Sequence, residues 1–229
     1  MKKIFIWTIA LAFAGKSRAQ LTILPVFDDK IIAEETWFVS KNGDSILFEN
    51  IRFYLSNFQF EMQDGTTIFD PQKAHLVDVF DAQTLKIALP KCEIKNIKKI
   101  RFNIGIDSLT NVSGALGGDL DPQNGMYWSW QSGYINLKIE GKSPQSKARK
   151  QAFQFHIGGY LPPFNALKTV ELDFSLPSGG DYTGGGRLKV EISKFFENLH
   201  LASQYNVMIP SREALELANN SVQMFSIEK

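Results

Sequence analysis

Short runs in which apolar and polar residues alternate recur along this chain and constrain its fold more than any other feature. β-Branched and aromatic residues are enriched in them, as in residues 45–62, SILFENIRFYLSNFQFEM. A period of two places successive side chains on opposite faces of a strand, which is the pattern of a half-buried sheet. Gly, Pro, Asn and Asp separate the runs, and Asn42-Gly43 and Asp64-Gly65 supply the positive φ of tight hairpins. The sequence therefore predicts an all-β fold, a single-domain antiparallel β-sandwich.

Nine runs are predicted to be strands. They cover residues 21–29, 45–62, 76–81, 85–90, 98–106, 126–141, 151–160, 169–176 and 186–196. Helical patterns are confined to one or two short segments near the C-terminus, at 193–199 and 211–220. In the second of these, Ser211 is a predicted N-cap and Glu213 favours the dipole of the first turn. No repeat, long linker or change of composition divides the chain, so we expect one domain.

The first 19 residues are typical of a secretory signal peptide. Lys2 and Lys3 precede a short apolar run, and Ser17 and Ala19 are the small residues that precede a cleavage site. We predict cleavage after Ala19 and a mature domain over residues 20–229. No later segment is long and apolar enough to span a membrane. The protein is therefore expected in the periplasm, or secreted beyond it.

Charge and cysteine content narrow the possible functions. The formal charge is +1, and loss of the signal peptide removes four basic and no acidic residues, which leaves a mildly acidic chain. Nucleic-acid binding requires a basic surface, whereas the one basic run, 141–150, is typical of an exposed hairpin loop. The single cysteine, Cys92, excludes an internal disulfide and is expected to be a buried thiol. The motifs G-x-S-x-G, H-E-x-x-H and C-x-x-C are absent, so we predict a binding protein and not an enzyme.

A cluster of aromatic residues between 126 and 134 is the most unusual local feature. Strict alternation would place Met126, Trp128, Trp130, Ser132 and Tyr134 on one face of a strand. Packing in the core is one interpretation of such a stripe. The other is a tryptophan held near a metal or a redox partner.

Two histidines are candidate metal ligands. In residues 151–160, Phe153 and Phe155 would face the core, so His156 would face the opposite way, beside a Gly-Gly pair that permits close approach of another segment. His75 is the second candidate. No two histidines have the spacing of a local metal site, so a metal would be assembled across strands, and imidazole with a softer third ligand suits copper better than calcium or magnesium. An ordinary hydrogen-bonded histidine is the alternative.

The longest irregular segment, residues 106–125, precedes the aromatic cluster and is rich in Gly, Asp, Asn and Ser. Long loops on a β scaffold often carry function. Asp107, Asp119 and Asp121 offer oxygen ligands for calcium, although the match to a calcium-loop pattern fails because Gly125 comes one residue late and no closing glutamate follows. The second glycine-rich segment, 177–187, lacks the ending of a phosphate loop and is interpreted as a linker.

The segments RFYLSNFQF, HLVD, FNIGIDSLTNVSGALGGDLDPQNGMYWSWQSGYINLKIEG and FQFHIGGY, in this order, resemble the MbnP-like family over nearly the whole mature chain. The resemblance implies an exported β-rich protein whose namesake binds copper in the periplasm, is associated with methanobactin systems and is commonly encoded beside a MauG-type di-haem partner, MbnH. It also implies that the partner oxidises a tryptophan to kynurenine, which helps to bind the metal. Trp128 and Trp130 are then the candidates for oxidation, and His156, with His75 as second choice, the candidate ligand.

The sequence thus predicts an exported, metal-handling protein that binds copper with His156 and His75. Modified or site-lining residues would be Met126, Trp128, Trp130 and Tyr134. Two alternatives stay open. One is a structural or protein-interaction module of the cell envelope in which the tryptophans belong to the core. The other is a calcium-stabilised carbohydrate-binding sandwich that uses the three aspartates and exposed aromatic rings.

Overall fold

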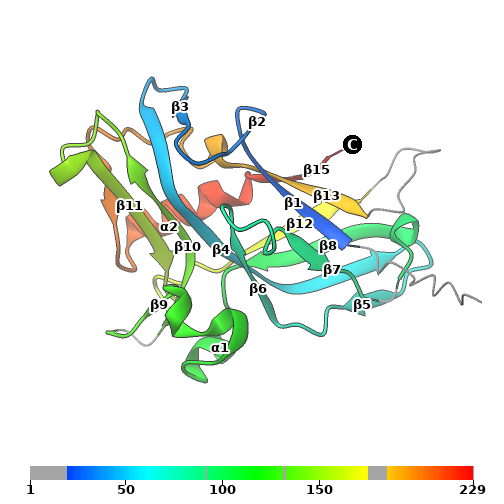
Figure 1. Ribbon diagram of the computed structural model, residues 1–229. Coiled ribbons are helices and arrows are strands. Elements are labelled where there is room, and N and C mark those ends of the chain that lie inside the picture. Colours follow the sequence, from blue (N-terminus) through cyan, green and yellow to red (C-terminus); the bar gives the residue numbers. More distant parts are fainter. Residues whose placement is uncertain (1–19, 91, 131–132, 175–184, 229) are drawn as a thin grey trace, which may run out of the picture.

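Two β-sheets pack face to face, as the sequence predicts (Figure 1). The computed structural model of the protein describes residues 20–90, 92–130, 133–174 and 185–228. The predicted signal peptide, residues 1–19, and most of the glycine-rich segment 177–187 lie outside the described residues. In the described part of the chain, no helix has the length and apolar character needed to cross a membrane.

The larger sheet has ten strands. Six of them follow the order β12-β8-β4-β10-β11-β14, and β3, β5 and β6 pair with β4 while β9 pairs with β10. Their bounds are β3 Trp37–Val39, β4 Ser45–Met62, β5 Thr67–Phe69, β6 Ala74–Asp78, β8 Ile97–Ile104, β9 Tyr127–Trp128, β10 Gly133–Lys142, β11 Ala152–Gly158, β12 Lys168–Asp173 and β14 Asn206–Val207.

The smaller sheet has five strands in the order β15-β13-β1-β2, with β7 paired to β1. Its strands are β1 Gln20–Phe27, β2 Lys30–Ile31, β7 Lys86–Ala88, β13 Gly186–Glu191 and β15 Phe225–Ile227. The helices are α1 Ser108–Val112 and α2 Arg212–Val222, with short 3₁₀ turns η1 Ile94–Asn96, η2 Gly118–Leu120, η3 Pro122–Asn124, η4 Arg149–Gln151 and η5 Ile192–Lys194. Ser211 caps α2 as predicted, because its hydroxyl accepts a hydrogen bond from the Ala214 amide at 3.1 Å.

Strand β4 is the central element of the larger sheet. It has the bounds that alternation predicts and pairs with β3, β5, β6, β8 and β10. Residues such as Phe53 and Leu55 are fully buried between the two sheets, whereas Arg52 and Tyr54 point to the opposite face. The turns at Gly43 and Gly65 have φ of 83° and 85°, which confirms the predicted positive φ at both.

Three features differ from the sequence prediction. The pairings of β1 with β13 and of β11 with β14 are parallel, so the sandwich is not purely antiparallel. Residues 126–141 form a hairpin, β9 and β10, because the chain turns after Trp128 and does not continue as one strand. The helix α1 lies in the segment 106–125, where the side chain of Asp107 caps it. It was not predicted because the segment has no apolar residues with helical periodicity.

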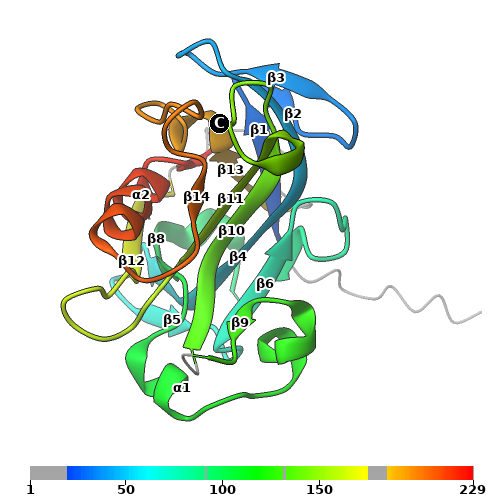
Figure 2. The same cartoon turned by 90° about the vertical axis from the view of Figure 1, so that its left-hand side faces the viewer.

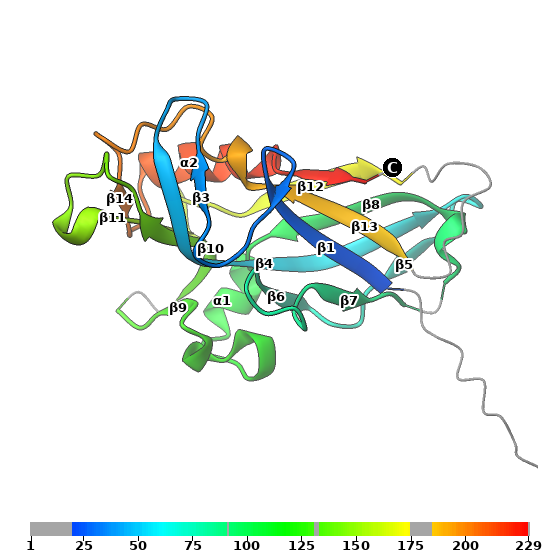
Figure 3. The same cartoon turned by 45° about the horizontal axis from the view of Figure 1, so that its top comes forward.

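The two faces of the larger sheet are covered differently (Figure 3). The smaller sheet and α2 cover one face, and together they enclose the main hydrophobic core. The segment 106–125 covers part of the other face, and a second, smaller core lies beneath it. This second core contains Tyr54, Ala74, Ile106, Leu120, Met126, Trp128, Tyr134 and Ile135. The long irregular segment, residues 106–125, is therefore packed against the sheet and is not a free loop. We call this segment the cover.

We expect alanine at Gly105, where the chain leaves β8 and enters the cover, to destabilise the fold strongly. Gly105 has a φ of 103°, and a Cβ there would overlap the side chain of Asn136. Alanine at Gly105 should lower the free energy of unfolding by about 2 to 4 kcal/mol, from backbone strain and overpacking together. The matched control is alanine at Gly43, where φ is 83° but no atom lies within 4 Å of a Cβ. There the loss should be about 1 kcal/mol. Urea unfolding of both variants tests this, and equal losses would contradict it.

Candidate functional site

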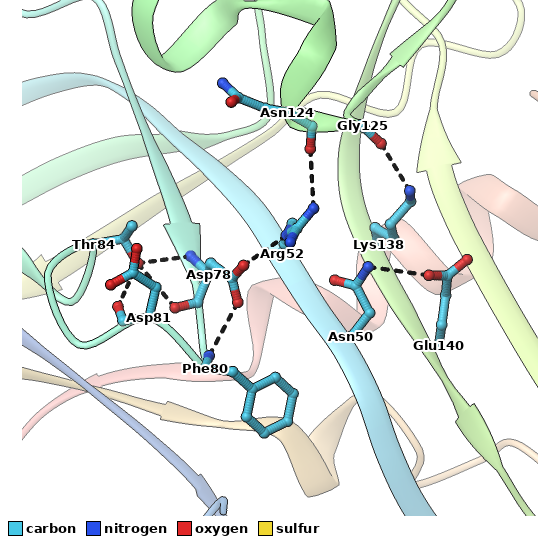
Figure 4. A network of polar contacts seen from close by, with 10 residues as sticks. All are labelled: Asn50, Arg52, Asp78, Phe80, Asp81, Thr84, Asn124, Gly125, Lys138 and Glu140. Carbon is cyan, nitrogen blue, oxygen red and sulfur yellow. Dashed lines mark hydrogen bonds and ion pairs between the residues drawn. The ribbon is translucent and has the colours of Figure 1, made fainter. Parts of the chain in front are cut away.

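Two cations on the outer face of the larger sheet hold the end of the cover (Figure 4). Nη1 of Arg52 donates to the carbonyl of Asn124 at 3.1 Å, and Nζ of Lys138 donates to the carbonyl of Gly125 at 2.7 Å. Arg52 and Lys138 lie opposite each other on β4 and β10, an arrangement of like charges that needs compensation. The carboxylate of Asp78, 2.7 Å from Nε of Arg52, supplies part of it. The two residues just before Met126 are thereby fixed to the sheet.

Two tyrosine hydroxyls bind carbonyl groups inside the cover. The Tyr54 hydroxyl donates to the carbonyl of Asp119 at 2.9 Å, and that of Tyr134 donates to the carbonyl of Leu120 at 3.0 Å. Their rings meet edge to face with centroids 5.8 Å apart. Burial raises the pKa of both phenols, so they remain protonated donors. Tyr134, which the sequence predicts to line a metal site, anchors the cover through this bond.

The carboxylate of Asp119 caps the outer edge of β6. Its Oδ2 atom accepts hydrogen bonds from the amide of Leu76 and from Nε2 of Gln72, each at 3.0 Å. An unpaired strand edge exposes backbone groups that attract other strands, and side chains that occupy those groups protect it. Asp119 therefore ties the cover to β6.

The other two aspartates of the calcium alternative also bind protein groups. Asp107 accepts from the amide of Thr110 at 2.8 Å, and Asp121 accepts from the amide of Gln123 at 2.8 Å. These are N-cap and turn interactions. Within the ranges that the structure describes, no group of three or more His, Cys, Asp or Glu side chains is arranged to hold a metal ion. The three aspartates each stabilise a separate part of the cover.

The indole of Trp128 packs against Gly158 at the end of β11. A Cβ at position 158 would lie 2.7 Å from Cζ3 and 3.0 Å from Cη2 of this indole, and 2.8 Å from the carbonyl oxygen of Tyr134. Only glycine leaves room for the ring there. Trp128 is 6% exposed, and Met126, fully buried, belongs to the same small core. The Gly-Gly pair noted in the sequence does permit close approach of other segments. Both the ring of Trp128 and the backbone carbonyl of Tyr134 come close to Gly158.

Trp130 contacts Trp128 from the solvent side. Their ring centroids are 5.5 Å apart and their planes are inclined by 43°, yet Trp130 is 61% exposed. The prediction that alternation would place both rings on one strand face was wrong, because β9 ends at Trp128. The two indoles nevertheless form a pair, one buried and one at the surface. Ser132, assigned to the same face, lies outside the described residues.

His156 lies on the same side of β11 as Gly158, two residues away. Its neighbours Phe155 and Ile157 point into the main core, so the predicted non-core orientation of His156 is confirmed. The imidazole is nonetheless only 7% exposed. Its Nε2 atom is 2.7 Å from Oε1 of Glu140, across the β10–β11 pair. The fold thus brings Trp128, distant in sequence, against Gly158, two residues along the same strand from His156.

Glu140 determines which ring nitrogen of His156 carries a proton. The hydrogen bond with His156, together with the charge of Lys138, lowers the pKa of Glu140 to about 2. The Glu140 carboxylate also accepts from Nε2 of Gln154 at 3.2 Å and from Nδ2 of Asn50 at 3.1 Å. Because an ionised carboxylate only accepts, Nε2 of His156 is the donor, and in the neutral ring Nδ1 keeps its lone pair. A metal-binding histidine commonly has this arrangement.

His75 lies elsewhere. It pairs with Leu55 on β4, and its ring meets the edge of Phe58 on the core side of the sheet. Its Nε2 atom is 2.6 Å from Oδ2 of Asp70, and it lines a cleft of about 690 Å³ together with residues of β7. Three strand spacings separate β6 from β11, on the order of 14 Å. His75 and His156 therefore cannot share one ion, contrary to the expectation of a joint site.

The residues around His156 fit a copper ion in part. A buried imidazole with a carboxylate on its other nitrogen is a suitable first ligand for copper. The remaining ligands would have to be of other kinds, such as the thioether of Met126 or a modified Trp128, which would present a ketone and an aromatic amine as kynurenine. Lys138 faces His156 across the strand pair and has its pKa lowered by burial, so a cation there would meet one positive charge.

Comparison with known proteins gives the family. The sequence model of MbnP matches residues 16–209. The chain belongs to the MbnP family. Its fold is similar to that of MbnP from Methylosinus trichosporium, with a TM-score of 0.64 and 14% sequence identity over 91% of this chain and 97% of that one. No curated protein sequence matches significantly. The resemblance seen in the sequence is thereby confirmed. Because the sequence identity with the solved structure of MbnP is only 14%, the structural similarity shows a common fold and no more.

Sequence reasoning missed Glu140, Arg52 and Lys138. All three lie at polar positions of predicted strands, where alternation places them away from the core. Their partners depend on the register between β4, β10 and β11, which periodicity does not specify. The signal available in the sequence was the presence of polar residues on the non-core face of the predicted strands, the face to which His156 was also assigned.

Replacement of Glu140 by Gln should remove a pH-dependent part of the stability. The pKa of Glu140 lies below its usual value in the folded protein, so the carboxylate stabilises the fold above about pH 4.5 and loses this effect as the pH falls toward 2. E140Q should cost about 2 kcal/mol near neutral pH and much less near pH 3, after allowance for partial exposure of the group. Urea unfolding across this pH range measures the difference. The control is E49Q, at an exposed carboxylate paired with Lys142, and a pH-independent loss in E140Q would contradict the assignment.

Proposed function

We propose that this chain is an exported copper-binding protein of the MbnP family, in which a MauG-type di-haem partner oxidises Trp128 to kynurenine and His156 binds the metal beside it. The juxtaposition of Trp128 and His156 through Gly158 carries the proposal. The two residues are far apart in sequence, and β9 and β11 bring them to neighbouring positions.

The hydrogen bond between Glu140 and His156 supports the same role. It fixes the ring orientation and the tautomer and leaves Nδ1 for a metal. Copper accepts imidazole together with softer or mixed ligands. The amine and ketone of kynurenine would add donors that tryptophan lacks, because the indole nitrogen has no available lone pair.

Of the two tryptophans, Trp128 is the preferred position of oxidation. Its ring packs against Gly158, two residues along β11 from His156, while Trp130 is 61% exposed. Helix α1 and strand β9 lie together at the same end of the molecule (Figure 2). Leu109 and Val112 of α1 are 76% and 63% exposed. A protein partner that docks there would cover this surface.

The same exposed surface also favours the second candidate function, a protein-interaction module without a metal. In that case Trp128 would be a core residue only, and the bond between Glu140 and His156 would serve stability. Copper binding separates the two functions.

Replacement of His156 by Gln should weaken copper binding by roughly tenfold or more, because one buried nitrogen ligand is lost. The matched control is H75Q, which removes the other carboxylate-paired histidine and should leave copper affinity unchanged, since His75 lies on the opposite face. Affinity is measured by competition with a chromophoric chelator. Protein from the native host is used for this, and peptide mass spectrometry of the same sample checks for kynurenine at Trp128.

Equal losses in H156Q and H75Q would contradict a site at His156. Absence of copper binding in native protein that carries unmodified Trp128 would favour the interaction module.

A further inference from the structure

The two tryptophans of the Trp128–Trp130 pair differ in burial, so that the pair leads from the surface into the interior. Trp130 is 61% exposed, and Trp128 is 6% exposed. With ring centroids 5.5 Å apart, the two π-systems are in van der Waals contact. On its inner side, Trp128 touches Gly158, beside His156. The contacts thus lead from solvent through Trp130 and Trp128 to Gly158, two residues along β11 from His156.

Indoles are among the side chains that lose an electron most readily, and electron transfer between aromatic rings in contact is much faster than transfer through the same length of saturated chain. An oxidant too large to enter the protein can reach Trp130 but not Trp128. The third tryptophan of the described chain, Trp37, is 51% exposed on β3, at the opposite end of the molecule from β9 (Figures 1 and 2). It has similar access to solvent and no contact with the site.

We propose that Trp130 is an electron relay through which an external one-electron oxidant withdraws electrons from buried Trp128. The oxidant takes one electron from Trp130 and is itself reduced by one. The Trp130 radical cation then takes one electron from Trp128, so Trp130 is restored and Trp128 becomes the radical cation. No bond forms or breaks in this transfer. The relay deepens the proposed function, since it rests on Trp128 as the residue that is oxidised and names how the oxidising equivalent reaches it.

Trp130 transfers electrons in this scheme and does not bind the metal. Hydrogen bonds hold the hairpin on both sides of the tryptophan pair, because Lys138 binds Gly125 just before β9 and Tyr134 of β10 binds Leu120. A fixed ring contact is what distinguishes a relay from an exposed side chain that happens to be oxidised.

The test uses a photo-oxidant and needs neither copper nor a protein partner. Ruthenium tris-bipyridine with a cobalt(III) quencher generates a bulky one-electron oxidant in light, and dissolved dioxygen traps the resulting tryptophan radicals as oxygenated products. The full mature chain is compared with W130F, W130Y and W37F. Peptide mass spectrometry reads the oxygenation of Trp128 and Trp37 separately, and unfolding in urea checks that each variant folds.

In the wild-type protein and in W37F we expect oxygenation at Trp128 in spite of its burial. In W130F most of this oxygenation should be lost, while that of Trp37 is unchanged, because phenylalanine keeps the ring contact but resists oxidation. In W130Y, where the ring can be oxidised, the yield at Trp128 should recover in part. Equal oxygenation of Trp128 in W130F and the wild type, or none in the wild type, would overturn the relay. Neither result bears on copper affinity, so failure of the relay and failure of the copper site remain distinguishable.

Discussion

The packing of one indole on one glycine determines how the outer face of this molecule is built. Gly158 lacks a side chain at the place where β11 ends, and Trp128 fills the space from the β9–β10 hairpin. Burial of an aromatic ring of this size stabilises the contact by several kcal/mol at most, which by itself cannot order a long segment. The cover of residues 106–125 is ordered because polar anchors on β4, β6 and β10 act together with that ring.

These anchors explain why a segment so poor in regular structure is nevertheless packed. Arg52 and Lys138 satisfy carbonyl groups that a 3₁₀ turn leaves unpaired, and the buried tyrosine hydroxyls satisfy others. The same polar row continues across the sheet to Glu140 and His156. Structural anchoring and the candidate site therefore share one face, and the orientation of the histidine depends on the same strand register as the cover.

The sandwich could be predicted from alternation, and strand β4 was predicted to the residue, because a strand buried on one face shows its period directly. The hairpin at Trp128 could not, since aromatic residues continue the apparent alternation through the turn. His156 could be assigned to the outer face, but its burial and its bond to Glu140 depend on cross-strand register. His75 looked equivalent in sequence and proved to lie on the other face. The aspartates of the cover resembled calcium ligands because caps and turns use the same residue type.

The proposed function requires that Trp128 and His156 form one surface in solution. The most direct measurement is nuclear Overhauser spectroscopy of the mature protein, with the indole of Trp128 and the backbone of Gly158 labelled. The proposed arrangement predicts strong contacts between the Hζ3 and Hη2 protons of Trp128 and the α-protons of Gly158. Their absence, with Trp128 in contact with other strands only, would contradict a shared site and leave no structural basis for a metal beside this tryptophan.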